Sequence, residues 1–401
     1  MDKYLNINNS CEIVYGENGA VLYDFDSSKI YNIEVIKAQI LRSSQNGIAL
    51  EKLFFKYGQT IVEKFIEDLI KARVGYIANT FIPTETYRVG NIKVNNYRKT
   101  YTLQRVYLEL PIGCNNNCKY CNIQKLNGCF SCSIPKDIYN KDLDFYTSII
   151  DKLCELNCET IILHGGDPLA EWGFTKKILE HILSQHNNKP NITLITNYTE
   201  INHEILQYFA EHNINIVLNV GYSIQLNSAD ISSYYNTLLE LGVNCIVNFN
   251  IEYKDIENFW DLYDILSFSC KNIYYSIYSN SEDELLKINY MSDLPNNIID
   301  PSTVVLSEFS HPCLFGTMSI KSDRKVYPCI GFNTNELLDL KKYNLKTLFF
   351  KSDELLKLWN MSIVNLENCS KCKFRKSCCD CRAFELSISE KIDSKLSCQL
   401  I

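Results

Sequence analysis

Residues 109–123 read ELPIGCNNNCKYCNI and place three cysteines, Cys114, Cys118 and Cys121, in a CxxxCxxC spacing. Three thiolates on one short loop can bind three irons of a 4Fe–4S cube, which leaves the fourth iron without a protein ligand. That iron can coordinate a small molecule, so the spacing favours a reactive centre over a structural one. The chain has 18 cysteines in 401 residues, and at that frequency chance alone gives this spacing in roughly 4 % of chains. The flanking sequence therefore decides between a chance spacing and a cluster-binding loop.

Strand–helix units surround the cysteine loop. Residues 106–110 are β-rich and stop at Pro111 and Gly113, which predicts a strand that ends in the loop. A helix is expected over 137–157 and a second strand over 160–164. The same order then repeats, with strands expected at 192–196, 214–220, 243–250 and 272–278 and helices at 174–185, 202–212, 228–241 and 255–268. This alternation predicts a parallel sheet of six strands, too few for a closed eight-stranded barrel.

The second strand runs directly into Gly165, Gly166, Asp167 and Pro168. These residue types are also those of an ordinary strand-to-helix turn. In parallel α/β folds, however, ligands bind at the carboxyl ends of the strands, where the cysteine loop, this segment and Asn197 all lie. We therefore expect them to converge on one site.

The cysteine loop, with Tyr120 directly before its third cysteine, and the Gly165–Pro168 segment together resemble the radical S-adenosylmethionine (SAM) enzymes. The resemblance implies an incomplete (β/α)6 TIM-like barrel in which Cys114, Cys118 and Cys121 hold a 4Fe–4S cluster that binds SAM. The family has Glu where Asp167 stands. The SAM-binding residues that the resemblance implies are Tyr120, Gly165, Gly166, Asp167, Pro168 and Asn197. The alternative for Asn197 is a loop residue that caps the next helix, and no catalytic side chain is assigned.

A second group of cysteines fills the last hundred residues. They are Cys313 in HPCLFG, Cys329 in DRKVYPC, those of NCSKCKFRKSCCDCR at 368–382, and Cys398. The spacing resembles the SPASM extension of radical SAM peptide-modifying enzymes, which implies two auxiliary 4Fe–4S clusters and three clusters in total. One auxiliary cluster would use Cys369, Cys372, Cys378 and Cys398, and the other Cys313, Cys329 and Cys381.

The sequence departs from that extension at several positions. Arg324 replaces a usual glycine, Cys381 follows Cys378 after two residues instead of three, and the neighbouring Cys379 leaves the register open. The nearest cysteine upstream of Cys313 is Cys270, so we infer an auxiliary cluster with three protein ligands and one open iron. The alternative for the whole tail is a zinc ribbon.

The remaining cysteines carry weaker signals. Cys129 and Cys132 form a CxxC that could be a redox pair or an extra metal site, but we favour an incidental pair because no partner pair follows. Core packing is expected for the others: Cys11, Cys154, Cys158, Cys245 and Cys270. The basic residues of the tail can offset thiolate charge or form a solvated surface; they are Lys371, Lys373, Arg375, Lys376 and Arg382.

The first hundred residues have a different character. A β-hairpin is expected over 21–33, helices over 35–41, 50–57 and 60–72, and a closing strand over 74–77. This order resembles the winged-helix-like domains that bind precursor peptides in peptide-maturing enzymes. A nucleic-acid-binding winged helix is the alternative, but the net charge of −7 and the absence of a strongly basic helix count against it.

Composition sets the remaining bounds. No apolar run reaches the about 18 residues of a membrane span, and the N-terminus has no apolar signal core. Abundant cysteine without a signal peptide predicts a cytoplasmic protein whose thiols bind metal. Polar boundaries at 89–99 and 293–302 predict a peptide-recognition domain over 1–95, a radical SAM domain over 100–295 and a SPASM domain over 300–401.

The resemblance implies a peptide maturase that forms a thioether cross-link through a 5′-deoxyadenosyl radical. It further implies a precursor peptide with a leader sequence and an electron donor such as flavodoxin or ferredoxin, with no nucleic-acid or membrane partner. The alternatives are a C–C or C–O cross-link, oxidation of a protein side chain as in sulfatase maturases, and a non-catalytic metal-binding adaptor.

Overall fold

The computed structural model describes residues 2–83, 103–116, 118–121, 126–127, 129–130, 135, 141–185, 188–197, 202–222, 228–279, 281–285, 304, 306–351, 353–378 and 380–398. Both expected domain boundaries, 89–99 and 293–302, lie outside these ranges, as do Cys132 and Cys379. No helix among the described residues is long and apolar enough to cross a membrane.

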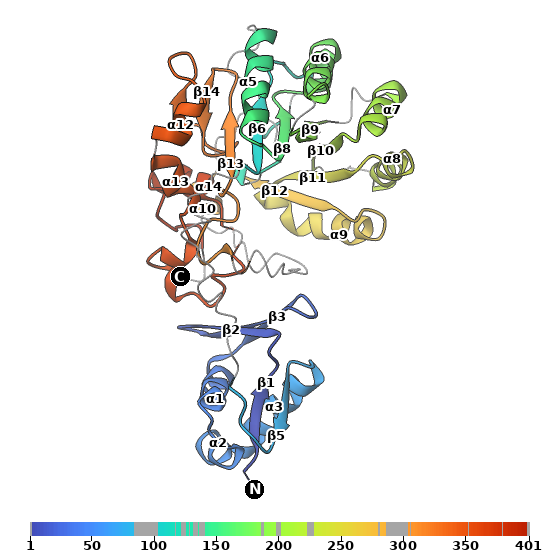
Figure 1. The fold of residues 1–401 in the computed structure, drawn as a ribbon. Coiled ribbons are helices and arrows are strands. Elements are labelled where there is room, and N and C mark those ends of the chain that lie inside the picture. Colours follow the sequence, from blue (N-terminus) through green and yellow to red (C-terminus); the bar gives the residue numbers. More distant parts are fainter. Residues whose placement is uncertain are drawn as a thin grey trace.

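The described strands of the central region form one sheet (Figure 1). The six strands expected from the sequence lie side by side in chain order, and each is parallel to the next. They are β6 (Arg105–Glu109), β8 (Thr160–His164), β9 (Asn191–Thr196), β10 (Asn215–Gly221), β11 (Cys245–Glu252) and β12 (Ile273–Tyr278). The predicted parallel α/β architecture is therefore confirmed.

Four shorter strands that the sequence did not predict extend this sheet. Next to β6 lies β13 (Thr317–Ile320), which is parallel to it and is followed by the antiparallel β14 (Lys325–Tyr327) and β15 (Leu338–Asp339). At the other edge, β7 (Leu126–Asn127) pairs antiparallel with β12. The cysteine-rich tail and the loop after the cysteine triad are thus both joined to the sheet.

Five helices cover one face of the sheet (Figure 1). They are α5 (Leu143–Glu155), α6 (Trp172–Leu183), α7 (His203–His212), α8 (Ser228–Glu240) and α9 (Ile256–Ser267). Because side chains alternate across a strand, Leu108 and Leu163 pack under the helices, whereas Tyr107 and Ile162 face the opposite side. That opposite side is the inner face of the curved sheet.

The N-terminal unit has a core of its own, built from residues such as Leu22, Leu41, Leu53 and Phe65. The expected hairpin is β3 (Gly19–Asp24) and β4 (Lys29–Ile33), and the expected helices are α1 (Val35–Gln45), α2 (Leu50–Tyr57) and α3 (Gln59–Lys71). The closing strand β5 (Gly75–Ala78) pairs with β1 (Tyr4–Ile7), and β2 (Cys11–Gly16) pairs with β3. The sequence missed β1 and β2.

The C-terminal segment starts against the sheet, whose core includes Leu348 and Trp359, and its last part lies between the sheet and the N-terminal unit (Figure 1). Its described elements are short: α12 (Lys346–Lys351), α13 (Asp353–Trp359), 3₁₀ turns at Ile363–Asn365 and Cys369–Lys371, and α14 (Arg382–Ser389). The strand pair β2–β3 contacts the tail directly, because the Glu17 amide donates to the Lys371 carbonyl over 3.3 Å.

Two basic residues of the tail do not have the solvated surface role that the sequence left open. Lys376 is buried and pairs with Glu12 of β2 and with Glu308. Arg382 is buried and pairs with Asp380. The first pair joins the N-terminal unit to the tail.

Candidate functional site

The cysteine triad lies on the loop that leaves β6. The thiols of Cys118 and Cys121 hydrogen-bond each other, and this contact, together with burial, raises the pKa of Cys118. Cys114 interacts electrostatically with Cys118, and burial raises its pKa. Its sulfur accepts the Asn116 amide over 3.4 Å and the Asn197 side-chain amide over 3.5 Å. Ligation as thiolates therefore calls for positive charge at this point, which irons supply.

Gly165 and Gly166 hold the cysteine loop in place. Both have positive φ, +114° and +52°, and a Cβ on Gly166 would lie 2.2 Å from the Ile112 carbonyl oxygen and 2.4 Å from that of Gly113. The Asp167 amide donates to the Gly113 carbonyl over 3.0 Å. The space freed by the two glycines is thus filled by the backbone leading to Cys114.

Asp167 and Asn197 come from neighbouring strand ends and are both buried. Asp167 Oδ1 accepts the Leu169 amide over 3.1 Å and the Thr196 hydroxyl over 2.6 Å, and so caps the 3₁₀ turn that begins at Pro168. Asn197 donates to Cys114, and the cap of α7 is Asn202. The helix-cap alternative for Asn197 is therefore wrong.

Tyr120 of the triad loop lies on the side of β12. Its buried ring lies 5.8 Å from that of Tyr278, the last residue of β12, and Cys118 and Cys121 pack against these two rings. A Cβ on Gly221 at the end of β10 would lie 3.3 Å from the Tyr120 ring. The triad loop thus contacts the carboxyl ends of β8, β9, β10 and β12.

A row of side-chain amides lines the inner face of the sheet on β10 and β11. The side-chain amides of Asn248 and Asn250 both donate to Asn219 Oδ1 over 2.8 Å, and Ser276 donates to Asn248 over 3.2 Å. Asparagine is unfavourable inside strands, so three of them at inward positions of β10 and β11 were a signal that the sequence analysis did not use. They give the inner face a polar wall beside the triad.

His164 precedes the two glycines and is fully buried. Neither ring nitrogen has a hydrogen-bond partner among the described residues, and burial lowers its pKa to about 3. Its ring lies 6.2 Å from that of Tyr107 in an edge arrangement. It is a neutral strand-end residue, and its ring nitrogens bond none of the triad thiols among the described residues.

The sequence pattern of the radical SAM superfamily matches residues 108–246, from the strand before the triad to β11. This chain contains a radical SAM domain. The radical SAM cyclopropyl synthase TigE of Paramaledivibacter caminithermalis is 24% identical over 149 residues, which cover 34% of this chain and 31% of that protein. The match therefore spans about a third of the relative's own length.

Two solved structures resemble this fold over most of the chain. Streptococcus suis SuiB bound to S-adenosylmethionine has 15% identity and a TM-score of 0.50, and the match covers 98% of this chain and 100% of that one. The protein anSMEcpe with bound AdoMet has 17% identity and a TM-score of 0.50, over 73% of this chain and 90% of that one. These likenesses show the fold, a radical SAM α/β fold with a parallel sheet.

Outside the radical SAM domain, the tail brings its cysteines together in two groups. In the first group, Cys369 packs with Cys378 around Ile363 and Leu366, and it interacts electrostatically with Cys372. Cys372 in turn interacts with Cys398. The four cysteines that the sequence assigned to one cluster are thus neighbours.

The second group contains Cys313, Cys329 and Cys381, and also Cys129. Cys313 interacts with Cys329, and Cys381 interacts with both. The Cys129 thiol donates to Cys313, which lowers the pKa of Cys313 to about 6. Cys129 of the CxxC pair thus contacts this group, whereas Cys132 lies outside the described residues.

A buried charge network separates the two groups. Asp380 receives ion pairs from Arg382 and Lys395, and His311 Nε2 lies 3.3 Å from its carboxylate. Burial opposes ionisation of Asp380, but His311 and the two cations outweigh it and hold its pKa well below the usual range. His311 Nδ1 accepts the Cys313 amide over 3.2 Å, so the network fixes the turn that presents Cys313.

Arg324 stands where the SPASM pattern has glycine, and its backbone conformation accounts for how the position tolerates a side chain. Its φ is +66°, so the backbone keeps a conformation that glycine adopts readily. The side chain pairs with Asp142 over 2.7 Å and lies 4.6 Å from the Phe145 ring centre. These contacts offset the backbone strain.

No three His, Cys, Asp or Glu side chains among the described residues surround a single point as ligands of one metal ion would. A cube differs because each thiolate binds a different iron. Three groups of neighbouring thiols, on one loop and in the tail, fit cubes in donor chemistry and in number.

Proposed function

We propose that this chain is a radical SAM enzyme that modifies a ribosomally made precursor peptide. The observation that carries the proposal is the triad loop itself, which is held by Gly165 and Gly166 and contacts Asn197 at the carboxyl ends of the parallel strands. Cys114, Cys118 and Cys121 would hold a 4Fe–4S cluster and leave one iron for SAM. When bound, the cluster supplies the one-electron cleavage of SAM and with it hydrogen abstraction from the substrate.

The residues around the triad would orient SAM and exclude water. Tyr120 closes one side with its ring against Tyr278, and the Gly165–Pro168 segment closes the other. Asn197 would stabilise negative charge on the Cys114 sulfur through its amide N–H. Residues 300–401 would hold two auxiliary clusters as a SPASM domain, and a flavodoxin or ferredoxin would supply electrons.

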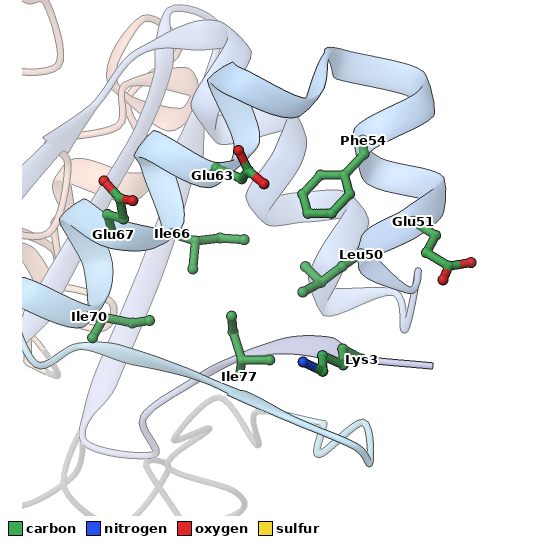
Figure 2. A pocket seen from close by; sticks show the side chains of 9 residues that line it. All are labelled: Lys3, Leu50, Glu51, Phe54, Glu63, Ile66, Glu67, Ile70 and Ile77. Atoms are coloured by element: carbon green, nitrogen blue, oxygen red, sulfur yellow. The ribbon is translucent and has the colours of Figure 1, made fainter. Parts of the chain in front are cut away.

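The N-terminal unit offers a groove for a peptide. A cavity of about 540 Å³ lies between α2, α3 and the β1–β5 pair. Figure 2 shows apolar side chains on its walls and glutamates at its rim. Its lining residues are Lys3, Leu50, Glu51, Phe54, Glu63, Ile66, Glu67, Ile70 and Ile77.

The chemistry of this groove indicates the kind of peptide. Glu63, Ile66, Glu67 and Ile70 recur at helical spacing, so one face of α3 points into it. Three glutamates against one lysine give the lining a net charge of −2. We infer that residues 1–95 bind a leader segment that carries apolar residues and at least one Lys or Arg, and that β5 can add a peptide strand.

The bond that the enzyme forms depends on the second tail group. A thioether, the product expected from the sequence, would be favoured by an auxiliary iron that is open to a substrate sulfur. A carbon–carbon or carbon–oxygen bond requires no such iron. The contact between Cys129 and Cys313 favours the latter, and the relative TigE is named a cyclopropyl synthase, a product closed by carbon–carbon bonds.

The direct test is anaerobic reconstitution with iron and sulfide, followed by reduction with dithionite in the presence of SAM. We expect release of 5′-deoxyadenosine, and no release from the Cys114→Ala/Cys118→Ala/Cys121→Ala variant, which should retain the iron of the tail. An iron-loaded wild-type protein that leaves SAM intact would support the non-catalytic adaptor instead.

The leader groove is tested separately, with a synthetic peptide that carries apolar residues and Lys or Arg as the probe. Glu63→Lys/Glu67→Lys should weaken peptide binding at least tenfold, whereas Glu240→Lys on α8 should not. Unchanged binding by the α3 variant would favour an enzyme that acts on a folded protein, as sulfatase maturases do.

A further inference from the structure

Cys129 lies far from the tail in sequence, yet its thiol contacts the second tail group. It donates a hydrogen bond to Cys313 and interacts electrostatically with Cys329 and Cys381. The buried hydroxyl of Tyr107, on the inner face of β6, interacts with Cys129, Cys313 and Cys329. Four thiols from three separate chain segments therefore surround one volume beside the inner face of the sheet.

The position of Cys129 is fixed by its own neighbours in the chain. Two residues earlier, Asn127 pairs with Ile277 of β12. One residue later, the Phe130 ring lies 5.4 Å from Tyr274 in an edge arrangement. Phe130 also packs on the apolar cluster that contains Tyr107 and Ile162.

The same structural supports hold the tail cysteines. Ile330, directly after Cys329, packs on the apolar cluster that Phe130 contacts. Cys381 packs with Ile277 and Phe384, and Ile277 is the partner of Asn127. A Cβ built on Gly331 would lie 2.9 Å from Ala383 of α14, so the Cys329 turn is pressed against the helix that follows Cys381.

We propose that Cys129 is the fourth protein ligand of the auxiliary cluster held by Cys313, Cys329 and Cys381. This assignment rests on the proposed function, because it assumes cubes in the tail. Four thiolates occupy all four irons of a cube, so this cluster has no open site for a substrate sulfur. The assignment replaces the three-ligand cluster inferred from the sequence and removes the main argument for a thioether product.

The position of Cys129 in the chain has a second consequence. It lies eight positions after Cys121, so one short stretch would ligate both the SAM-binding cluster and an auxiliary cluster.

The test uses the full chain in the Cys114→Ala/Cys118→Ala/Cys121→Ala background, which leaves only auxiliary clusters. Cys129→Ala is added to one sample and Cys270→Ala, a buried cysteine that packs in the core, to the control. Each reconstituted protein is reduced and its EPR spectrum recorded with and without excess 2-mercaptoethanol as the thiol probe. Iron and sulfide per chain are measured in parallel.

We expect the thiol to leave the spectra of the background and of the Cys270→Ala control unchanged and to shift the signal of the Cys129→Ala protein. Identical spectra with and without Cys129, or a thiol-induced shift while Cys129 is present, would overturn the assignment. A tail that binds no iron would overturn it as well. The proposed function is judged independently by 5′-deoxyadenosine release from the wild-type chain, so the two failures are distinguishable.

Discussion

Gly166→Ala tests whether the strand-end glycines position the cysteine loop. An alanine at φ +52° pays about 1–2 kcal/mol for the left-handed backbone. Its Cβ would also lie 2.2 Å from the Ile112 carbonyl oxygen and 2.4 Å from that of Gly113. Relief of such overpacking costs about 1–3 kcal/mol, and the total is about 2–5 kcal/mol. Because Gly113 precedes Cys114, relief moves the first ligand of the triad.

The matched control is Gly173→Ala at the start of α6. A Cβ there meets nothing within 4 Å, and alanine is favoured over glycine in a helix by up to about 1 kcal/mol. Urea unfolding followed by tryptophan fluorescence measures the stability of both variants, and iron analysis with 5′-deoxyadenosine release reports the triad. We expect Gly166→Ala to be destabilised and to lose at least tenfold in SAM cleavage. If it unfolds with the wild type and cleaves SAM at the same rate, the positioning argument is wrong.

Three further predictions concern charge and hydrogen bonding. Asp380→Asn removes the carboxylate that pairs with buried Arg382 and Lys395, of which Lys395 keeps Glu385 as a partner, and should cost about 3–5 kcal/mol near neutral pH. Because the folded pKa of Asp380 is depressed, this stability is present above the unfolded pKa of about 3.9 and is lost as the pH falls through the folded pKa. Equal urea midpoints of variant and wild type at pH 7 would contradict the network. Lys376→Met should raise hydrogen–deuterium exchange in β2 and β3. The control Lys371→Ala removes an exposed ion pair worth about 0–1 kcal/mol and should not raise it. Similar exchange in both variants would mean that the buried Lys376–Glu12 pair does not dock the N-terminal unit. Asn197→Ala removes the N–H that donates to the Cys114 sulfur. The reduction potential of the triad cluster, measured by EPR redox titration, should therefore become more negative. An unchanged potential would place the amide away from the loaded cluster.

The architecture followed from local patterns because strand and helix periodicity are properties of short segments. The six parallel strands, the helices between them and the three N-terminal helices were predicted within a few residues, except that the first helix begins at Leu143, six residues after its expected start. Strand β2 forms a hairpin with the directly following β3, a local signal that was missed. Strand β1 was missed because its partner β5 is distant in the chain. The strand β13, which extends the sheet next to β6, was missed for the same reason.

The site, too, was predicted where it depends on local spacing and missed where it depends on the fold. Spacing within one loop singled out Cys114, Cys118 and Cys121 as candidate ligands, because residues three or four positions apart in a loop are near each other in any fold. No spacing could assign Cys129, since its partner Cys313 is brought to it only by the pairing of β7 with β12 and by the packing of Phe130. The role of the Gly165–Gly166 pair likewise emerged only when the Ile112 and Gly113 carbonyls were placed against it.

The sequence alone determined which chemistry this protein can support: a three-thiolate loop at a strand end and a second supply of thiols in the tail. The tertiary structure decided how those thiols are grouped and which basic residues of the tail are buried, such as Lys376 beside Glu12. The physical reason is that ligand grouping and ion pairing depend on distances across the fold. Those distances are set by sheet order and core packing, and no local pattern in the chain encodes them.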